Sequence, residues 1–564
     1  MSAVGLQRAW RVAEEDRPNT AMLAKGLRVP RIVAHLLMLR GIRTVEEGNA
    51  FLNPSLHDLL DPFTLTDMQP AVDRIEHARR NEDPVLVFGD YDVDGIAGTA
   101  ILIKALQRYG IEPCRYGMPS RLLEGYGIAP EHVEAARNDG IRLIITVDNG
   151  VNAHEAAATA RRLGIDLIVT DHHEIEGELP HAVAVINPKR EDESCPGRYV
   201  SGAAVAFYLA HALTRAVEDL DLVALGTVAD VVPLGAQNRA LVALGLEQMA
   251  QRPRVGLRHL AAVAGMNLQE ITAEKIAFQL APRINAAGRL GEGLAPLRLL
   301  LTDSETEAAQ MAAELNKANE ERRSIEKQIL EEATEEIEAT LRADVRTIVL
   351  ARRGWHPGII GIVASRLQST HNRPVALIAL DKDGVGRGSA RSADDFDMIA
   401  ALGACRDHVV RFGGHAAAAG FTILEENIRK FQTAFEGEAA KRLRTGETPP
   451  VVDVDVQVSF TEIDAQLVKA IDRLEPFGCM NPSPVFCTYG VTPVPYSVRE
   501  LRGGHARVRV QQGPRLFEAV GFHMAGLIQQ TVGTGPIDIA YTPRLNTWRG
   551  ETAIQLVLKD VHCV

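Results

Sequence analysis

The chain has 564 residues, of which 46% are hydrophobic and 24% charged, and its formal net charge at pH 7 is -12. This length predicts three or four domains, and the composition excludes a disordered or fibrous protein. The negative charge excludes a protein coated with positive charge, but a local basic groove for nucleic acid is compatible with it.

Membrane and disulfide classes are also disfavoured. No apolar run reaches the length of a membrane span, and residues 1–30 carry charges throughout. The six cysteines form no CxxC pair, so we interpret them as reduced thiols. We expect a cytoplasmic protein that does not associate with membranes.

Residues 1–49 mix short apolar and basic pieces without a chemical motif, and we expect an N-terminal extension that packs on the next domain. Residues 50–303 alternate short, β-branched apolar runs with amphipathic stretches of helix length. This alternation predicts βαβ units and a parallel sheet. The predicted strands are residues 85–88, 143–147, 166–170 and 182–186.

Acidic and imidazole side chains follow three of these strands. Asp90, Asp92 and Asp94 follow the first, Asp148 the second, and the triplet Asp171, His172 and His173 the third. The carboxyl ends of parallel strands meet at one edge of a sheet, where active sites of such folds lie. Each Asp alone could be a turn former or a helix cap, but three successive strands ending in ligand-capable residues indicate a metal site.

A mixed set of oxygen and nitrogen ligands favours Mn²⁺ or Mg²⁺ over a structural zinc ion. Two such cations, bridged by carboxylates, would activate a water and stabilise an in-line displacement at phosphorus, so the predicted chemistry is phosphoester hydrolysis. Asp230, in the apolar helical segment 224–234, either joins this set or caps the turn before Pro233. The expected ligands are Asp92, Asp94, Asp148, His172 and Asp230.

Residues 304–342 contain no Gly or Pro and start with the capping-box spacing Ser304 to Glu307. They predict one long connecting helix, or two helices broken near residues 316–321. Residues 343–446 show a second, smaller α/β pattern with strands at 347–350, 374–380 and 416–423. After the pair Pro449 and Pro450, residues 450–564 alternate apolar and polar positions, which predicts an all-β, OB-like domain.

Taken together, these motifs resemble those of the DHH phosphoesterase superfamily. The matching segments are GDYDVDG at 89–95, DNG at 148–150, DHH at 171–173 and VALGTVADVVPL at 223–234, and GGHAAAAG at 413–420 resembles the signature of the associated DHHA1 domain. Related pyrophosphatases carry a His where this chain has Phe88, which points away from pyrophosphate as substrate. The resemblance covers nearly the whole chain from about residue 20.

The resemblance implies roles for single positions. Asp92, Asp94, Asp148, His172 and Asp230 would hold two metal ions. His173 would lie beside the phosphate, with Asp171 and Asp90 supporting the site. The resemblance also implies that Gly388, Ser389 and Arg391 hold a terminal phosphate and that Gly413, Gly414 and His415 close over the nucleotide. Apart from the resemblance, the forked guanidinium of arginine suits bidentate contact with phosphate, so arginines among small residues are further substrate candidates: Arg121, Arg283 and Arg289.

The function implied by this resemblance is 5′ to 3′ exonucleolytic hydrolysis of single-stranded DNA, dependent on Mn²⁺ or Mg²⁺, in recombination and repair. A helicase or a single-strand-binding protein is an expected partner, and a monomer is the expected state. Two alternatives remain at this point. One is a phosphodiesterase of the same superfamily acting on short RNA or small nucleotides, and the other is a non-catalytic binding subunit of a replication complex.

Overall fold

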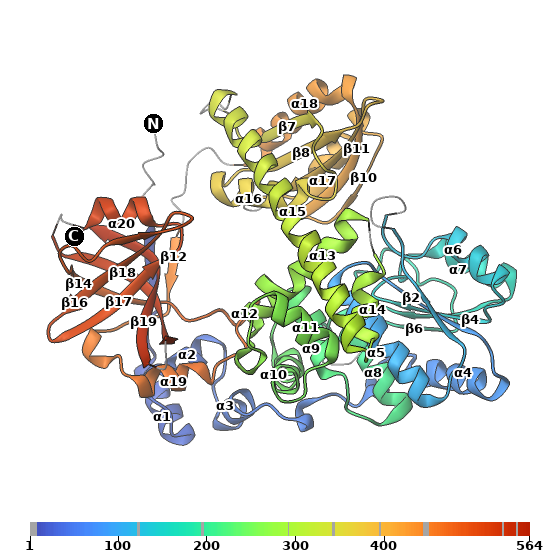
Figure 1. The fold of residues 1–564 in the computed structure, drawn as a ribbon, viewed down its shortest axis with the longest axis horizontal. Helices are drawn as coiled ribbons and strands as arrows, with labels where there is room; N and C mark the ends of the chain where they lie inside the picture. The colour runs from blue at the N-terminus through green and yellow to red at the C-terminus, as the bar shows by residue number, and fades with distance from the viewer. Residues whose placement is uncertain are drawn as a thin grey trace.

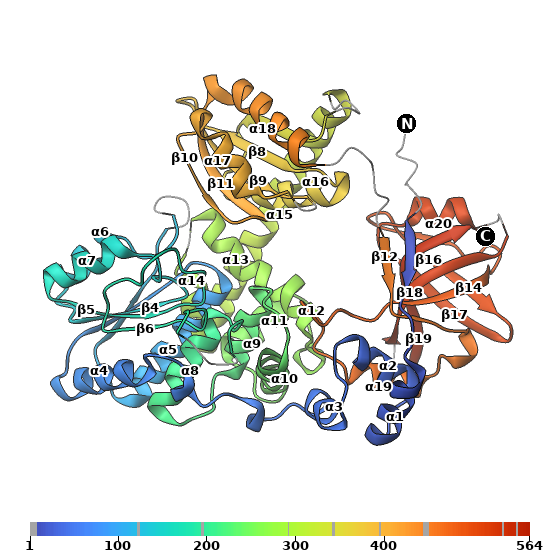
Figure 2. The same ribbon diagram turned by 180° about the vertical axis from the view of Figure 1, so that it is seen from behind.

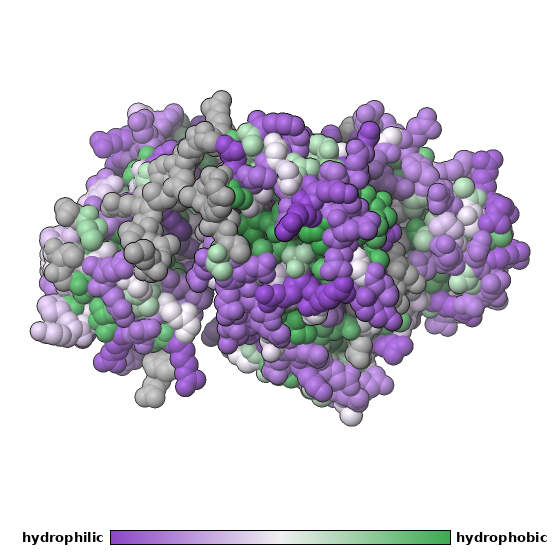
Figure 3. Space-filling view, turned by 90° about the horizontal axis from the view of Figure 1, so that it is seen from above, coloured by the Kyte–Doolittle hydropathy of each residue, from purple (hydrophilic) through white to green (hydrophobic). Residues whose placement is uncertain are grey.

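The structure is a computed structural model that describes residues 8–120, 125–192, 197–291, 293–340, 345–393, 396–443, 451–532, 535–548 and 551–563. Figures 1 and 2 show three bodies: a parallel α/β body, a smaller α/β domain above it, and a β-rich domain beside it. Seen from above, the surface is mainly hydrophilic, with hydrophobic residues showing near the middle of the view (Figure 3). Within the described residues, no helix combines the length and hydrophobicity needed to cross a membrane.

The first body contains the predicted parallel sheet, with strand order β3-β2-β4-β5-β6. Helices α4, α5 and α8 cover one face, and α6 and α7 cover the other. Strand β3 was not predicted, because its residues Cys-Arg-Tyr-Gly lack an apolar run. The bounds are β2 Val85–Gly89, β3 Cys114–Gly117, β4 Leu143–Val147, β5 Asp166–Thr170, β6 Ala184–Ile186, α4 Met68–Asn81, α5 Val93–Tyr109, α6 Pro130–Asn138, α7 His154–Leu163 and α8 Gly202–Thr214.

A group of helices extends this body toward the others. The bounds are α9 Leu220–Ala229, α10 Ala236–Gln251, α11 Val255–Val263, α12 Ala273–Lys275, η4 Ile276–Leu280, α13 Ala281–Leu290 and α14 Ala295–Leu301. The described residues also include short 3₁₀ helices: η1 Leu56–Asp58, η2 Pro62–Thr64, η3 Leu268–Glu270, η5 Arg406–His408, η6 Glu425–Asn427 and η7 Phe460–Glu462.

The connecting helix α15, Glu305–Thr340, is unbroken. Its start is capped as the spacing predicts, since the Glu307 amide donates to Ser304 Oγ at 3.3 Å. Its first half packs into the core of the first body, and its second half packs into the core of the smaller domain. One helix therefore fixes the distance between these two bodies (Figure 1).

The smaller domain has a mixed sheet with strand order β10-β11-β9-β8-β7. Helices α17 and α18 pack on one face, and α16 packs on the other. Trp355 is buried in this packing and donates to Glu332, so it is a packing residue and presents no free ring for stacking. The bounds are β7 Ile348–Arg353, β8 Val375–Leu380, β9 Val385–Arg391, β10 Arg411–Gly414, β11 Ala418–Leu424, α16 Ile360–His371, α17 Met398–Ala404 and α18 Ile428–Arg442.

The β-rich domain has strand order β13-β14-β18-β19-β17-β16-β15, and an additional pairing of β14 with β16 closes it into a barrel. The predicted fold class, two α/β domains joined by a long helix and followed by an OB-like domain, is confirmed. The bounds are β13 Val456–Gln457, β14 Phe486–Pro493, β15 Arg499–Leu501, β16 His505–Gln512, β17 Arg515–Gly521, β18 Ile537–Trp548, β19 Glu551–Cys563, α19 Ala465–Asp472 and α20 Ala525–Thr531.

The N-terminal segment does not pack where we expected it. Its helices share one hydrophobic core with the β-rich domain, because apolar side chains such as Leu23, Val33 and Leu36 meet Phe460 and Leu467 there. Strand β1 also pairs in parallel with β12. The expectation that residues 1–49 pack on the catalytic domain was therefore wrong for most of this segment. The bounds are β1 Ala9–Val12, α1 Arg17–Leu27, α2 Arg31–Leu39, α3 Val45–Leu52 and β12 Val451–Val454.

Contact between the first body and this terminal assembly runs through Arg239 of α10. The Arg239 side chain is fully buried and donates to the carbonyl oxygens of Phe51, Leu474 and Glu475. Its guanidinium also lies 3.8 Å from the centre of the Phe51 ring. Since a buried guanidinium is stable only with such partners, this residue ties three segments together.

Candidate metal centre and substrate cleft

The carboxyl edge of the first sheet gathers most of the acidic and histidine residues that the sequence singled out. Ligand atoms of three groups lie within 4.8 Å of one another: Asp148, His172 and His173; Asp94, His172 and Asp230; and Asp90, Asp92 and Asp148. Asp148 and His172 each belong to two groups. The arrangement therefore offers adjoining positions for more than one cation, as two-metal hydrolases require.

Two carboxylates at the start of α5 are held by backbone amides. Asp92 caps the helix, accepting from the amides of Asp94 at 2.9 Å and Gly95 at 3.1 Å. Asp94 accepts from the amides of Gly202 at 2.6 Å and Ala203 at 3.0 Å, at the N-terminus of α8. Helix N-termini stabilise negative charge, so both carboxylates are fixed in place before any cation binds.

His172 lies at the centre of the carboxylates. Its Nε2 is 3.0 Å from Asp148 Oδ1, 3.6 Å from Asp230 Oδ2 and 3.8 Å from Asp94 Oδ2. Asp230 follows the last residue of α9, which brings it in from a separate helix. Although they are close, Asp148 Oδ1 and His172 Nε2 are both buried without a hydrogen bond of acceptable geometry. Such orphaned atoms in the interior are accounted for by a ligand that they share.

The pKa values of the clustered side chains indicate that the carboxylates repel one another and would be stabilised by a bound cation. Burial, and then the neighbouring carboxylates, raise the pKa of Asp94 and of Asp148 well above the usual range. Burial and Asp92 raise the pKa of Asp230 to about 7, and burial lowers the pKa of His172 to about 3. Mn²⁺ or Mg²⁺ would favour the ionised carboxylates, and the neutral imidazole of His172 can bind a cation without losing a proton. These residues therefore fit the predicted cofactor.

His173 is held by Asp171. The Asp171 carboxylate is buried and accepts from His173 Nδ1 at 2.7 Å and from the backbone amides of His172, His173 and Val151. Burial is the largest single effect and by itself would lower the pKa of His173. The hydrogen bond to Asp171 and the nearby carboxylate charges together outweigh it and raise the pKa to about 9. Asp171 thus orients His173 and leaves Nε2 as the ring nitrogen it does not engage.

Asp90 lies beside the ligand set. It is buried just after β2, and its amide donates to the carbonyl of Val147 at 3.2 Å. Its carboxylate is close enough to those of Asp92 and Asp148 for the three to hold a cation together. The supporting role that the resemblance implies for Asp90 therefore stays a prediction.

Tyr126 is a site residue that sequence reasoning missed. Its hydroxyl donates to the carbonyl of Asp148 at 2.8 Å and lies 2.8 Å from His173 Nδ1. The ring is 51% exposed at the mouth of the site. Gly125 and Gly127 flank it with φ of 91° and 78°, values that favour glycine. In the sequence, the feature that could have pointed to this residue was an aromatic side chain between two glycines.

We expect Tyr126→Phe to lower kcat by roughly fivefold, with little change in KM, because the imidazole of His173 loses one of the two oxygens that orient it. Steady-state kinetics on the substrate that the family resemblance implies measure this. Tyr199→Phe is the matched control, since Tyr199 is similarly exposed, at 58%. Equal kcat values in the two variants would contradict the role assigned to Tyr126.

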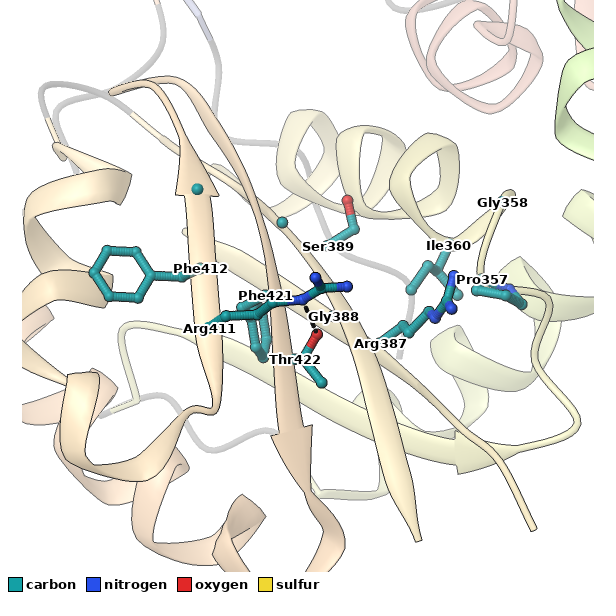
Figure 4. A pocket seen from close by; sticks show the side chains of 12 residues that line it. Pro357, Gly358, Ile360, Arg387, Gly388, Ser389, Arg411, Phe412, Phe421 and Thr422 are labelled. Carbon is teal, nitrogen blue, oxygen red and sulfur yellow. Dashed lines mark hydrogen bonds between the residues drawn. The ribbon is translucent and has the colours of Figure 1, made fainter. Parts of the chain in front are cut away.

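A cavity of about 410 Å³ lies on the sheet of the smaller domain. Figure 4 shows Ser389 and Gly388 on β9 together with Arg387, Arg411 and Thr422. Among the predicted substrate residues, Gly388, Ser389 and Gly413 line this cavity, whereas Gly414 is the exposed last residue of β10 and His415 begins the exposed turn that follows. Arg387 and Arg411 were not predicted, although Arg387 lies two positions from Ser389 on the same face of the strand.

The predicted arginines lie at different places. Arg391 donates to the hydroxyls of Ser365 and Ser389, both at 3.0 Å, beside the cavity. Arg289 on α13 donates to the carbonyl of Gly358, which also lines the cavity. Arg283 donates to Asn316 Oδ1 of α15 and to the carbonyl of Gln279, and it is not a cavity residue. Arg121 lies outside the described residues.

Helix α13 joins the metal centre to the cavity. A Cβ atom on Gly288 would lie 3.3 Å from the carbonyl oxygen of Tyr91, between the Asp-rich residues. The next residue, Arg289, reaches Gly358 on the cavity side at 2.9 Å. Helix α13 therefore lies against the Asp-rich segment at Gly288 and contacts the edge of the cavity at Arg289.

Family models match most of the chain. The DHH family N-terminal domain matches residues 84–227, the DHHA1 domain matches residues 344–441, and the RecJ OB domain matches residues 454–560. These are the three bodies seen in the structure.

Curated relatives and solved structures match over nearly the full length. The chain is 34% identical to the single-stranded-DNA-specific exonuclease RecJ of Salmonella typhimurium over 98% of this chain and 99% of that protein. It is 35% identical to that of Bacillus subtilis, over 98% of this chain and 70% of that protein. The crystal structure of RecJ from Thermus thermophilus in complex with Mn²⁺ matches with a TM-score of 0.83 at 32% identity, covering 99% of this chain and 80% of that one, and the same protein in complex with Mg²⁺ matches with a TM-score of 0.78.

Proposed function

The chain belongs to the RecJ family of DHH proteins, and we propose that it is a metal-dependent exonuclease that hydrolyses single-stranded DNA from the 5′ end. The observation that carries this proposal is the group of carboxylates around His172, which includes buried ligand atoms without a hydrogen-bond partner. The chain retains every residue of the ligand set that the family resemblance names, which disfavours a non-catalytic binding subunit.

Asp92, Asp94, Asp148, His172 and Asp230 would hold Mn²⁺ or Mg²⁺. When bound, these cations supply an activated water and positive charge at the phosphoryl oxygens. The chain itself supplies orientation. Asp171 and Tyr126 fix the ring of His173, so that its Nε2–H can donate a hydrogen bond to an oxygen of the scissile phosphate.

We assign the 5′-terminal phosphate of the strand to the cavity on the smaller domain. A terminal phosphate carries more charge than an internal phosphodiester, and Arg391 with Ser389 forms a fixed pair of donors for it. Arg387 and Arg411 add positive charge to the same face. Holding the 5′ terminus there would place a phosphodiester of the same strand at the metal centre across α13.

We extend the proposal to the setting of the enzyme. It would act in the cytoplasm as a monomer, in recombination and repair, on strands supplied by a helicase or covered by a single-strand-binding protein. The β-rich domain would contact the phosphate backbone through Arg499 and Arg507, which are paired across β15 and β16 and exposed. A phosphodiesterase for short RNA or small nucleotides would have no use for that surface.

Digestion of end-labelled DNA tests the proposal. In the presence of Mn²⁺, a 5′-labelled single strand should release its label in the first turnovers, whereas a 3′-labelled strand should shorten progressively. A complementary strand should protect both, and EDTA should stop release. Early release of the 3′ label would overturn the polarity, and equal digestion of duplex would overturn the strand specificity.

A further inference from the structure

Val231, the residue after Asp230, has a backbone that its side chain disfavours. Its φ is 58°, in the left-handed region that a β-branched residue rarely adopts. Its side chain is nevertheless 67% exposed, so burial in the core does not compensate for this strain. Strained residues that persist at the edge of an active site indicate a functional constraint on that position.

Met480 repeats this combination. Its φ is 60° and it is 75% exposed. It lies at the tip of a tight turn closed by hydrogen bonds between Gly478 and Asn481 in both directions, at 2.9 and 3.1 Å. Asn481 is buried and donates to the carbonyls of Leu474 and Pro476, which makes the turn rigid. The apolar side chain is therefore presented to solvent by a fixed support.

The two turns are joined. The amide of Leu234, three residues after Val231, donates to the carbonyl of Cys479 at 2.9 Å. A Cβ atom on Gly478 would lie 2.8 Å from Leu234 Cδ1, so the turns also touch through side-chain atoms. In Figures 1 and 2 the loop after α19 reaches from the β-rich domain to the helices around α10 and α12. Val231, next to Asp230 in the chain, and Met480, next to Cys479, thus belong to two turns that contact each other.

We propose that Val231 and Met480 form an apolar step on which unstacked bases of the DNA strand pack as it passes from the β-rich domain to the metal centre. The inference rests on the proposed function. A phosphodiester held beside Asp230 brings its nucleoside next to Val231, and apolar side chains without charge suit base faces rather than phosphates. The step adjoins the metal centre because Val231 directly follows the proposed ligand Asp230 in the chain.

Isosteric polar substitutions test the step. The variant Val231→Thr with Met480→Gln keeps shape and removes apolar surface. The control variant Val183→Thr with Met22→Gln makes the same changes at exposed positions elsewhere, where Val183 is 41% and Met22 is 69% exposed. With a single-stranded 20-mer and Mn²⁺, we expect KM to rise about tenfold in the step variant and less than about twofold in the control variant.

An abasic strand of the same length separates base contact from other causes. Because the proposed contact is to bases, wild type and step variant should have the same KM for the abasic strand. An equal loss on both strands, or no loss on either, would overturn the inference, and the second outcome is the one expected if the step binds another protein. Failure of the wild type to digest the normal strand would instead refute the proposed function.

Discussion

Asp148→Asn is expected to abolish hydrolysis and to stabilise the metal-free protein. Asparagine keeps the shape of the side chain and tolerates the φ of 62° at this position. It removes one carboxylate from two of the three ligand groups, so we expect kcat to fall by about three orders of magnitude. It also removes a buried charge next to Asp94, and we expect about 1–2 kcal/mol of added stability in EDTA, or roughly 2–4 °C in Tm.

Thermal unfolding with and without Mn²⁺ measures both effects. Adding Mn²⁺ should raise the Tm of the wild type, and it should raise the Tm of the variant only slightly. The pH dependence is a further check. The folded protein raises the pKa of Asp148 and of Asp94, and that of Asp230 to about 7, so it holds protons more tightly than the unfolded chain. Metal-free stability should therefore fall as pH rises from about 4 to about 7, and less so in the variant. A lower Tm of the variant in EDTA would contradict this account.

Gly226→Ala is expected to inactivate the enzyme although it improves helix propensity. A Cβ atom on Gly226 in α9 would lie 2.3 Å from Asp94 Oδ1 and 2.6 Å from the Cβ of Ala203. The added methyl group must displace either the carboxylate or the helix that carries Asp230. A shift of about 1 Å in such a site costs on the order of a hundredfold in rate, and the overpacking costs about 1–3 kcal/mol.

Gly437→Ala is the matched control. Gly437 lies inside α18, and a Cβ atom there would have no atom within 4 Å. We expect this variant to be fully active and slightly more stable, by about 0.5–1 kcal/mol, because alanine favours a helix. Full activity of Gly226→Ala with Mn²⁺ would show that the close approach to Asp94 is not needed.

The strand ends of the first sheet could be predicted because each strand is a short apolar run and polar residues follow it directly. Val85–Gly89 and Leu143–Val147 are apolar runs, and the polar residues after them must meet at one edge. Strand β9 could not be predicted, because its inward positions are small. A Cβ atom on Gly388 would lie 2.2 Å from Phe421, so the ring of a neighbouring strand fills the space that an apolar residue would otherwise mark.

Contacts between segments that are distant in sequence could not be predicted from hydrophobic periodicity and motif spacing. Tyr126 reaches His173 through a loop whose path no periodicity specifies. The glycines at 202 and 226 do not differ in sequence from ordinary helical glycines, yet both lie against metal-site carboxylates. The packing of α1 and α2 on the β-rich domain depends on which apolar faces remain uncovered once every domain has formed.

That last arrangement has a consequence for synthesis on the ribosome. Leu23 to Leu37 emerge well before their partners in the β-rich domain, which begin at Val458, about 420 residues later. At about 5–20 residues per second the apolar face of these helices is without its partner for roughly 20–80 s, while the domains between them can already fold. The core shared by α1, α2 and the β-rich domain therefore closes late, and until then the apolar face of these helices is open to non-native contacts.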